Sequence, residues 1–401
     1  MATVMRDASG EATLRGAMSV TIGIVAGEAS GDALAATLIA AVRARLPNAR
    51  FVGVAGPKME AAGCDAWVPL ETLSVRGLVE VLDHLPELVR VRRTLVRRFL
   101  NERIDVFVGV DAPDFNLGLE RKLKRRGVRT VHFVSPSVWA WRRERIHTIG
   151  RSVNRLLALF PFEPPLYEPA RVPVTYVGHP LAQDAATAAS RREARDYLRI
   201  PPAQPVFALL PGSRQSELDM HGDLVLQTAA AIHAQKPDAR FLVPLATRPT
   251  RERFEAALFR LKLEALPLTL LYGHARDALM AADVGIVASG TATLEAALAR
   301  CPHLVFYRVK ALTEWYVRRK FLLPYVGLPN VLAGRFVVPE FLQDDATVAN
   351  LTQAAVNLYD DTVTRQRLEA LFAGFAAALC VDTGARAADA VIDELMAARS
   401  R

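Results

Sequence analysis

Two stretches in the second half of the chain hold glycine, hydroxyl and charged side chains at spacings that suit a bound phosphate. The first, residues 209–217, reads Leu-Leu-Pro-Gly-Ser-Arg-Gln-Ser-Glu and ends an apolar run. A strand that turns into a helix directs free N–H groups and the positive end of the helix dipole to one point, and Arg214 can add a two-pronged contact there. The pattern favours a diphosphate. It is not a P-loop, because the Gly-Lys-Ser/Thr ending is absent.

A second stretch, residues 284–295, repeats the same plan. Its apolar run ends in Ser289, Gly290 and Thr291, and Glu295 follows about one helical turn later, where a carboxylate can reach a ribose diol. Either stretch alone could be ordinary turn chemistry. Together they predict a site for a nucleoside diphosphate.

Polar side chains also follow apolar runs in the first half of the chain. They are Glu28, Ser30, Asp32, Asp111 and Asp114. Reacting groups of open parallel sheets gather where strands end, and Asp111 stands where an apolar run meets a turn. Asp111 is therefore our first candidate for a general base, with Glu28 and Asp32 as alternatives. Ser30, Asp32 and Asp114 could equally cap helices.

Aromatic and basic residues stand together after the apolar run 131–134. Trp139 and Trp141 follow Ser135 and precede three arginines. Aromatic rings beside basic groups suit a sugar face or a bilayer interface, although they could also simply cover the edge of a sheet. His179, in a Gly-His-Pro turn, is a catalytic candidate by position and could equally orient a linker.

The elements that must hold these residues alternate along the chain. Short apolar runs and amphipathic helical patterns follow one another in both halves, which predicts parallel sheets with right-handed crossovers. The 401 residues suit two domains. We therefore predict an α/β protein with two Rossmann-like domains and a helical C-terminal segment. The expected parts are a disordered 1–18, a first domain 19–185, a second domain 186–360, and a helical segment 361–401 that packs back on the first domain or on a neighbouring subunit.

Composition and charge narrow the class of protein. Hydrophobic residues make up 51% of the chain and the formal net charge is +8, which is typical of a globular protein with a basic surface. The basic residues alternate with aliphatic ones rather than with the exposed aromatics that bases need, so we expect no nucleic-acid partner. The three cysteines have no metal-ligand spacing, which indicates a reducing cytoplasm.

Several segments combine basic residues with apolar or aromatic ones. They are 76–100, 121–129, 139–145 and 315–323. A basic amphipathic helix can lie on a membrane surface, or it can pack on a core and leave its basic face solvated. Pro86 interrupts the first segment, so we expect two helices or a kink there. No uncharged apolar run of about 18 residues exists, so we expect peripheral membrane contact and no transmembrane helix.

A series of short motifs resembles, in the same order, the lipid-A-disaccharide synthase family. The motifs are Ala-Gly-Glu-Ala-Ser-Gly-Asp at 26–32, Phe-Val-Gly-Val-Ala-Gly-Pro at 51–57, Val-Asp-Ala-Pro-Asp-Phe at 110–115, Ser-Pro-Ser-Val-Trp-Ala-Trp at 135–141, Gly-His-Pro at 178–180, Leu-Pro-Gly-Ser-Arg at 210–214, Ala-Ser-Gly-Thr-Ala-Thr-Leu-Glu at 288–295 and Leu-Pro-Asn at 328–330. Each motif alone is weak, and the set is specific. The resemblance runs from about Val20 to the C-terminus.

The resemblance implies a glycosyltransferase-B architecture, in which two Rossmann-like domains face a central cleft. It implies an inverting transferase that joins UDP-2,3-diacylglucosamine to 2,3-diacylglucosamine 1-phosphate and yields the β(1→6) disaccharide 1-phosphate and UDP. It also implies peripheral attachment to the cytoplasmic face of a bacterial inner membrane, while a homodimer stays open. No cofactor is implied. Because the sequence holds no Asp-x-Asp element, we expect no metal, and arginine and helix dipoles would neutralise the departing UDP.

Residue roles follow from the matching motifs. The resemblance makes Asp111 the base, Arg214 the diphosphate clamp and Glu295 the ribose ligand, and Asn330 should line the cleft on the donor side. The other donor-site residues are Gly212, Ser213, Glu217, Ser289, Gly290 and Thr291, and the acceptor-side residues are Ser30, Asp114, Ser135, Trp139, Trp141 and His179. Gly327 stands where some relatives have serine, so we assign no hydroxyl role to position 327.

Two other functions are kept as alternatives. A UDP-sugar 2-epimerase would share the nucleotide half but would have no use for a basic amphipathic surface. A lipid- or nucleotide-binding regulator without catalysis would tolerate Asp111→Asn, whereas a transferase would lose most of its rate.

Overall fold

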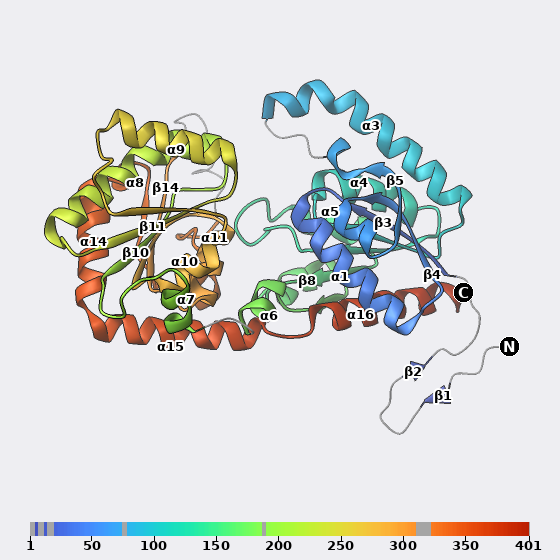
Figure 1. Cartoon of the computed structure of the whole chain (residues 1–401). Coiled ribbons are helices and arrows are strands. Elements are labelled where there is room, and N and C mark those ends of the chain that lie inside the picture. The colour runs from blue at the N-terminus through green and yellow to red at the C-terminus, as the bar shows by residue number, and fades with distance from the viewer. Residues whose placement is uncertain are drawn as a thin grey trace. The chain divides into compact units, whose positions relative to one another are not determined.

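The computed structural model describes residues 20–73, 78–186, 190–309 and 322–400, together with two short strands near the N-terminus. Side chains are described for these ranges except at 78–85 and 186. The chain forms two compact units (Figure 1). One comprises Met1–Pro180 with Val381–Arg401, and the other comprises Leu181–Cys380.

The first unit is built on a seven-stranded parallel sheet in the order β5-β4-β3-β6-β7-β8-β9. Its strands are β3 (Val20–Ala26), β4 (Ala49–Ala55), β5 (Cys64–Pro69), β6 (Val106–Val110), β7 (Arg129–Phe133), β8 (Arg155–Ala158) and β9 (Val174–Tyr176). The central strands are almost wholly buried, as expected when helices cover both faces of a parallel sheet. Ala26 pairs with Val110, and Val110 pairs with Phe133. The residues that follow these strands therefore lie side by side at one edge.

Helices cover both faces of this sheet. They are α1 (Ala29–Arg45), α2 (Pro57–Ala61), α3 (Leu78–Asn101), α4 (Pro113–Lys124), α5 (Arg145–Ser152) and α16 (Thr383–Arg399), with the 3-10 turns η1 (Leu70–Thr72) and η2 (Pro164–Ala170). On one face, Leu95 and Phe99 of α3 pack with Phe115 and Leu119 of α4 against the sheet. Of the two outcomes expected at Pro86, two helices or a kink, the first does not occur, because α3 is one helix through this residue.

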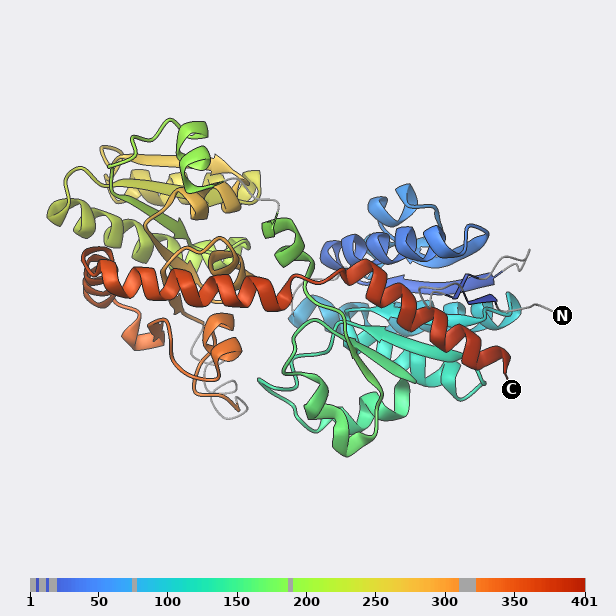
Figure 2. The same ribbon diagram turned by 90° about the horizontal axis from the view of Figure 1, so that it is seen from below.

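The last helix, α16, packs on the first unit beside α1 and across β6, β7 and β8 (Figure 2). Its Glu394 is almost fully buried. The Glu394 carboxylate accepts hydrogen bonds from Arg129 Nε at 2.7 Å and from Arg155 Nε at 3.0 Å. These charge-assisted bonds join α16 to β7 and β8.

The second unit contains a six-stranded parallel sheet in the order β12-β11-β10-β13-β14-β15. Its strands are β10 (Val206–Leu210), β11 (Arg240–Leu245), β12 (Leu268–Tyr272), β13 (Val284–Ala288), β14 (His303–Tyr307) and β15 (Glu340–Leu342). The adjacent strands β10 and β13 are in register, with Leu210 opposite Val287. The turns that follow these two strands therefore meet at one edge of the sheet.

Two layers of helices enclose the second sheet. The helices are α6 (Pro180–Ala186), α7 (Arg191–Tyr197), α8 (Gln215–Gln235), α9 (Arg248–Arg260), α10 (Ala275–Ala281), α11 (Thr291–Leu298), α13 (Leu328–Ala333), α14 (Val348–Asp360) and α15 (Thr362–Leu379), with the 3-10 turn η3 (Gln343–Asp345). One core joins the sheet to α8, α9 and α14. The other joins it to α7 and α10. The predicted α/β architecture with two parallel sheets and a helical C-terminal segment is confirmed.

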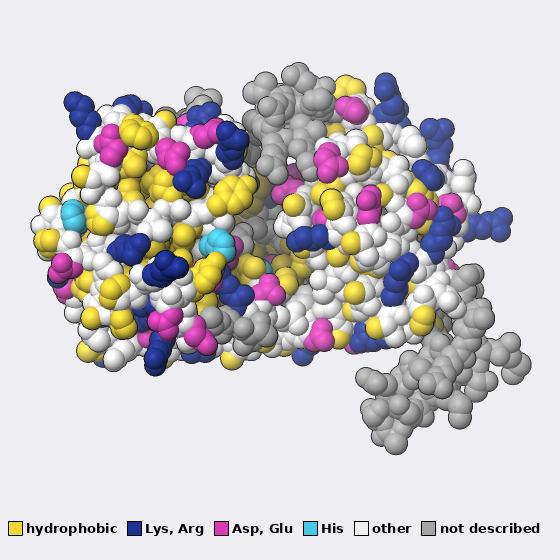
Figure 3. Space-filling model, viewed as in Figure 1, with side chains coloured by type: hydrophobic (Ala, Val, Ile, Leu, Met, Phe, Trp, Pro, Cys, Tyr) yellow, Lys and Arg dark blue, Asp and Glu magenta, His cyan; other side chains and the backbone are white. Residues whose placement is uncertain are grey.

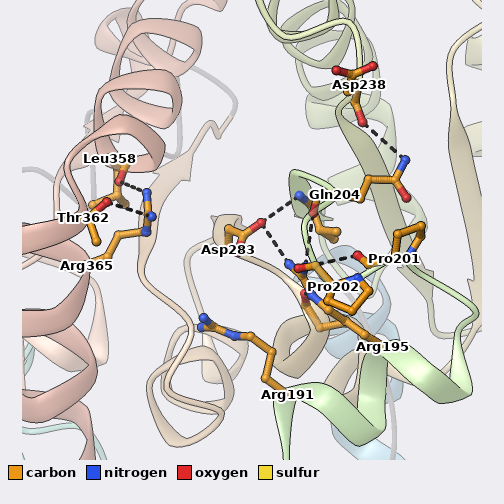
Figure 4. A network of polar contacts seen from close by, with 12 residues as sticks. Arg191, Arg195, Pro201, Pro202, Gln204, Asp238, Asp283, Leu358, Thr362 and Arg365 are labelled. Atoms are coloured by element: carbon orange, nitrogen blue, oxygen red, sulfur yellow. Dashed lines mark hydrogen bonds and ion pairs between the residues drawn. The ribbon is translucent and has the colours of Figure 1, made fainter.

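A buried arginine anchors α7 to this sheet (Figure 4). The Arg195 guanidinium donates to the carbonyl oxygens of Ala281 at 2.9 Å and Gln204 at 3.2 Å, and to the Asp283 carboxylate at 3.0 Å. Asp283 also accepts the N–H of Val206 at 2.9 Å. The network therefore holds α7 to the starts of β10 and β13.

Within the part of the chain that the structure describes, one helical stretch, Thr362–Arg399, is long and apolar enough to cross a membrane by length and composition alone. It comprises α15 and α16, whose bounds leave three residues between them. α15 packs on α11 and α14, and α16 packs on the first sheet.

Two regions singled out in the sequence fall largely outside the described residues. Of the N-terminal segment 1–18, the structure describes only β1 (Met5–Arg6) and β2 (Ala12–Thr13), which pair antiparallel. Of the basic-aromatic segment 315–323, it describes only the last two residues.

Candidate functional site

The two phosphate-type turns of the second unit line one cavity. Its volume is about 400 Å³, and it lies where β10 and β13 end. The structure brings together here all the predicted donor-site residues except Asn330: Gly212, Ser213, Arg214, Glu217, Ser289, Gly290, Thr291 and Glu295. Tyr307, at the end of β14, also lines the cavity and was not predicted.

Both turns use glycine where another residue would be strained. Gly212 has φ +125° and Gly290 has φ +146°, in the region that side chains with a Cβ rarely adopt. Helix α8 begins three residues after Gly212 and α11 begins directly after Gly290. The positive ends of two helices therefore lie at one cavity. This arrangement suits an anionic ligand.

Glu295 projects into the same cavity from the second turn of α11. Burial raises the pKa of its carboxyl group. A carboxyl group beside two helix N-termini can accept hydrogen bonds from hydroxyls of a neutral ligand part such as a ribose.

Asn330 does not line this cavity, which corrects the sequence-based assignment. Its side chain is fully buried. The amide nitrogen donates to Val338 O at 3.0 Å and to Glu340 Oε1 at 2.7 Å, and the amide oxygen accepts the N–H groups of Val337 and Val338 at 2.7 and 2.9 Å. Every polar atom of this side chain is thus used to fix the loop that follows α13.

We predict that Asn330→Ala destabilises the second unit. It leaves buried N–H and C=O groups without partners, each worth about 1–3 kcal/mol, so the melting temperature should fall by roughly 5–10 °C. Calorimetry measures this, with Asn350→Ala as a control, because Asn350 is exposed and its side chain donates one bond to Asp345 O. An unchanged melting temperature combined with lost nucleotide binding would mean that Asn330 contacts the ligand instead.

A second cavity, of about 340 Å³, lies at the strand ends of the first unit. Of the predicted residues, it is lined by Asp111, Asp114, Ser135 and Trp141, together with Arg142 and Arg145. Arg145 pairs with Asp114 at 2.5 Å, and the Arg142 guanidinium lies 4.4 Å from the centre of the Trp141 ring. A carboxylate, an aromatic face and two cations therefore share one hollow.

Asp111 stands in a strained turn. Asp111 and Ala112 have φ values of +53° and +43°, which cost free energy for residues other than glycine. The turn is held by Asn116, whose buried side chain donates to Asp111 O at 2.8 Å, and by the Asp111 N–H, which donates to Phe133 O at 2.8 Å. A Cβ at Gly27 would lie 2.3 Å from that of Ala112, so Gly27 allows the neighbouring turn to approach.

A buried acid–base pair lies behind this turn. His132 Nδ1 and Glu120 Oε1 are 2.6 Å apart, and both side chains are inaccessible to solvent. A Cβ on Gly109 of β6 would lie 2.2 Å from Glu120 Oε1. This acid–base pair was not predicted, because residues 120 and 132 come together only when α4 packs on β7.

The polar candidates that follow β3 lie in two different environments in the structure. Glu28 and Ser30 are exposed. Asp32 is buried, and its carboxylate accepts the N–H groups of Gly56, Lys58 and Met59 at 3.0–3.1 Å. These bonds cap α2. Asp32 is therefore committed to the turn after β4, which leaves Glu28 as the accessible alternative to Asp111.

The remaining acceptor-side candidates surround a buried carboxyl group, Glu163, that was not predicted. Glu163 is 1% exposed and accepts the N–H of Phe160 at 2.9 Å. Burial raises its pKa to about 7. Hydrogen bonds to the carboxylate act in the opposite direction and come from Phe160, Ser135, Leu159 and Trp139. Ser135 Oγ also lies 2.8 Å from Tyr167 Oη. Ser135 and Trp139 therefore support a core, with Trp139 edge-on to Phe162.

His179 belongs to the same region. It is largely buried, and its ring lies 5.5 Å from that of Phe160. Burial lowers its pKa to about 4, so the imidazole is neutral at physiological pH. This charge state suits a positioning role.

We predict that Glu163 makes the stability of the first unit depend on pH. Its folded pKa is above that of an unfolded chain, so its contribution is complete below about pH 4.5 and is lost as the pH rises through 7. Glu163→Gln removes this titration. From pH 5 to pH 8 the variant should therefore gain on wild type by up to about 3 kcal/mol. Thermal melts at both pH values measure this, and parallel shifts of the two proteins would contradict it.

The architecture resembles that of solved structures from other proteins. The chain resembles the MurG of Acinetobacter baumannii with a TM-score of 0.58 over 94% of this chain and 100% of that one, at 13% identity. It also resembles the UDP-GlcNAc 2-epimerase of Neisseria meningitidis with a TM-score of 0.57 over 94% of this chain and 100% of that one, at 11% identity. These likenesses place the fold in the glycosyltransferase-B class.

Comparison of sequences identifies the family, whereas the structural likeness gives only the fold. The model of the lipid-A-disaccharide synthetase family matches residues 22–378. The lipid-A-disaccharide synthase of Dechloromonas aromatica is 53% identical over 376 residues, which are 94% of this chain and 98% of that protein. The chain therefore belongs to the lipid-A-disaccharide synthase family of glycosyltransferases, and the resemblance seen in its motifs is confirmed.

Proposed function

We propose that the chain transfers 2,3-diacylglucosamine from its UDP derivative to the 6-hydroxyl of 2,3-diacylglucosamine 1-phosphate. The C1–O bond to UDP breaks, a β(1→6) bond forms, and the hydroxyl proton goes to a base. The observation that carries the proposal is the cavity of the second unit, where two glycine turns, Arg214 and Glu295 converge. Such an array fits UDP.

In the donor site, each group would meet one part of UDP. The Arg214 guanidinium and the N–H groups at the starts of α8 and α11 would hold the diphosphate and offset the charge that grows as UDP departs. Ser213, Ser289 and Thr291 offer hydroxyls to the phosphate oxygens. Glu295 would accept the ribose hydroxyls.

In the first unit, Asp111 would take the proton of the acceptor hydroxyl. The substrate is anionic at its 1-phosphate, and Arg142 and Arg145 supply positive charge in the cavity that Asp111 lines. Inversion requires the hydroxyl to attack from the side opposite UDP. One displacement and one base therefore suffice, with Glu28 as the alternative base.

Peripheral attachment to the cytoplasmic face of an inner membrane is part of this proposal. On α3, Arg90, Arg93 and Arg97 are exposed, while Leu88, Val91 and Val96 pack against the core. The described part of α3 is thus a packed helix with a solvated basic face. Figure 3 shows Lys and Arg side chains on the surface of the first unit. That face can attract an anionic lipid surface.

The test is whether UDP release requires both substrates. Purified protein in detergent should release UDP from UDP-2,3-diacylglucosamine only when 2,3-diacylglucosamine 1-phosphate is present. The fold is shared with a 2-epimerase, so the donor without acceptor is the decisive control. Consumption of the donor at an equal rate without acceptor would refute the transferase.

A further inference from the structure

The phosphate-type turn after β10 already holds an anion, and that anion is a side chain of the protein. The Glu217 carboxylate accepts the N–H of Ser213 at 2.8 Å and the N–H of Arg214 at 3.1 Å, both through Oε2. Oε1 accepts the hydroxyl of Tyr307 at 3.1 Å. The carboxylate thus uses the N–H groups that make this turn a phosphate site.

The position of the carboxylate is electrostatically favourable. Glu217 is the third residue of α8, where a negative charge interacts well with the positive end of the helix dipole. It also lies directly over the turn, because a Cβ built on Gly212 would come within 2.5 Å of Glu217 Oε2. No room is left between the carboxylate and the backbone that would receive a phosphate.

A diphosphate and this carboxylate compete for the same donors. Each N–H makes one strong hydrogen bond, and two anions at hydrogen-bond distance repel each other. Glu217 is half-buried and lines the cavity that Arg214 and Ser213 also line. The ligand therefore has to displace it.

We infer that Glu217 is an internal substitute for the diphosphate. Its carboxylate accepts the N–H groups of Ser213 and Arg214, turns away when the UDP-sugar binds, and returns as UDP leaves. Tyr307 acts as its latch, because its hydroxyl holds the second carboxylate oxygen. This inference depends on the proposed function, which supplies the diphosphate. It makes Glu217 a positioning residue that weakens the binding of donor and product.

The chain offers a matched control for the helix-capping part of this geometry. Glu193 of α7 accepts the N–H of Ser190 at 2.6 Å and the hydroxyl of the same residue at 2.8 Å, so it also caps a helix from the third position. It does not line the UDP cavity. Glu193→Gln therefore perturbs a cap without perturbing the anion site.

The experiment measures the dissociation constants of UDP and of uridine by calorimetry, at one salt concentration, for wild type, Glu217→Gln and Glu193→Gln. Glutamine keeps the shape and one acceptor oxygen but removes the charge. We expect Glu217→Gln to bind UDP at least about threefold more tightly, with uridine unchanged. Glu193→Gln should bind both ligands like wild type.

The outcomes separate this inference from the proposed function. Wild type that binds no UDP would overturn the proposed function. Wild type that binds UDP, with Glu217→Gln equal or weaker, would overturn only the role of Glu217, as would an equal gain for uridine. Tyr307→Phe is a second variant that leaves the cap bonds intact. It should tighten UDP binding in wild type and add nothing in the Glu217→Gln background, since the latch acts through the carboxylate.

Discussion

Asp111→Asn is expected to lower the turnover number of the transfer reaction by about 10²–10⁴-fold, the range that general-base catalysis supplies. Asparagine has nearly the same shape and tolerates the left-handed backbone of residue 111. The bond from Asn116 goes to the main-chain oxygen of Asp111, so it is retained. The fold, and the binding of UDP in the other unit, should therefore be unchanged while the base is lost.

The comparison variants for this prediction lie close to Asp111. Asp114→Asn changes a carboxylate of the same cavity that is already paired with Arg145, so its rate should fall less than that of Asp111→Asn. Single-turnover rates and thermal melts of both variants separate chemistry from folding. If Asp111→Asn keeps the wild-type rate and Glu28→Gln does not, then Glu28 is the base.

Arg214→Ala is expected to reduce kcat/KM by about 10²–10³-fold, which is typical of removing one group that stabilises transition-state charge. The guanidinium is exposed and lines the cavity proposed to bind the donor, so its loss leaves the core intact. UDP should bind more weakly. Arg214→Lys restores the charge but not the forked geometry, so it should recover only part of the loss.

Arg253 provides the control for Arg214. It lies on α9 and donates to Gln215 Oε1 of α8 at 3.0 Å, but it does not line the cavity. Arg253 also forms an exposed ion pair with Asp219. Because such pairs contribute little free energy, Arg253→Ala should leave the affinity for UDP within a factor of about two. Equal losses for both variants would show that net charge, rather than a specific clamp, explains the effect of Arg214.

The architecture was predictable because its signals are local. Unbroken apolar runs such as those of β6 and β13 are fully buried central strands, and the helical patterns between them require parallel crossovers. The short edge strands β5 and β15 were not predicted, since their residues are only partly buried. At Pro86 the sequence allowed two helices or a kink, and the structure has one helix through this residue.

The candidate sites were predictable to the extent that their residues follow strands. The turns at 212–214 and 289–291 converge because β10 and β13 are neighbours in register. The hydrogen-bond partners of buried polar side chains could not be predicted from the sequence in this way. Asp32 caps a helix 25 residues further along the chain, and Asn330 bonds to Glu340 across a loop.

The contacts of Glu163 and Glu217 were likewise not predictable from the sequence. Nothing in the sequence around Glu163 marks a buried carboxyl group, yet this group is buried and accepts hydrogen bonds from Ser135, Trp139 and the Phe160 N–H. For Glu217 the sequence predicted a contact with the donor, whereas the structure places its carboxylate on the protein's own N–H groups. Long-range packing decides such contacts.

The most direct measurement of the central claim is the structure of the product made by the purified protein from UDP-2,3-diacylglucosamine and 2,3-diacylglucosamine 1-phosphate. Mass spectrometry and proton NMR should find one disaccharide 1-phosphate for each UDP released, with a β-configured anomeric proton at the new linkage. An α-linked product would contradict inversion by a single displacement. Release of UDP without any disaccharide would contradict the transfer itself.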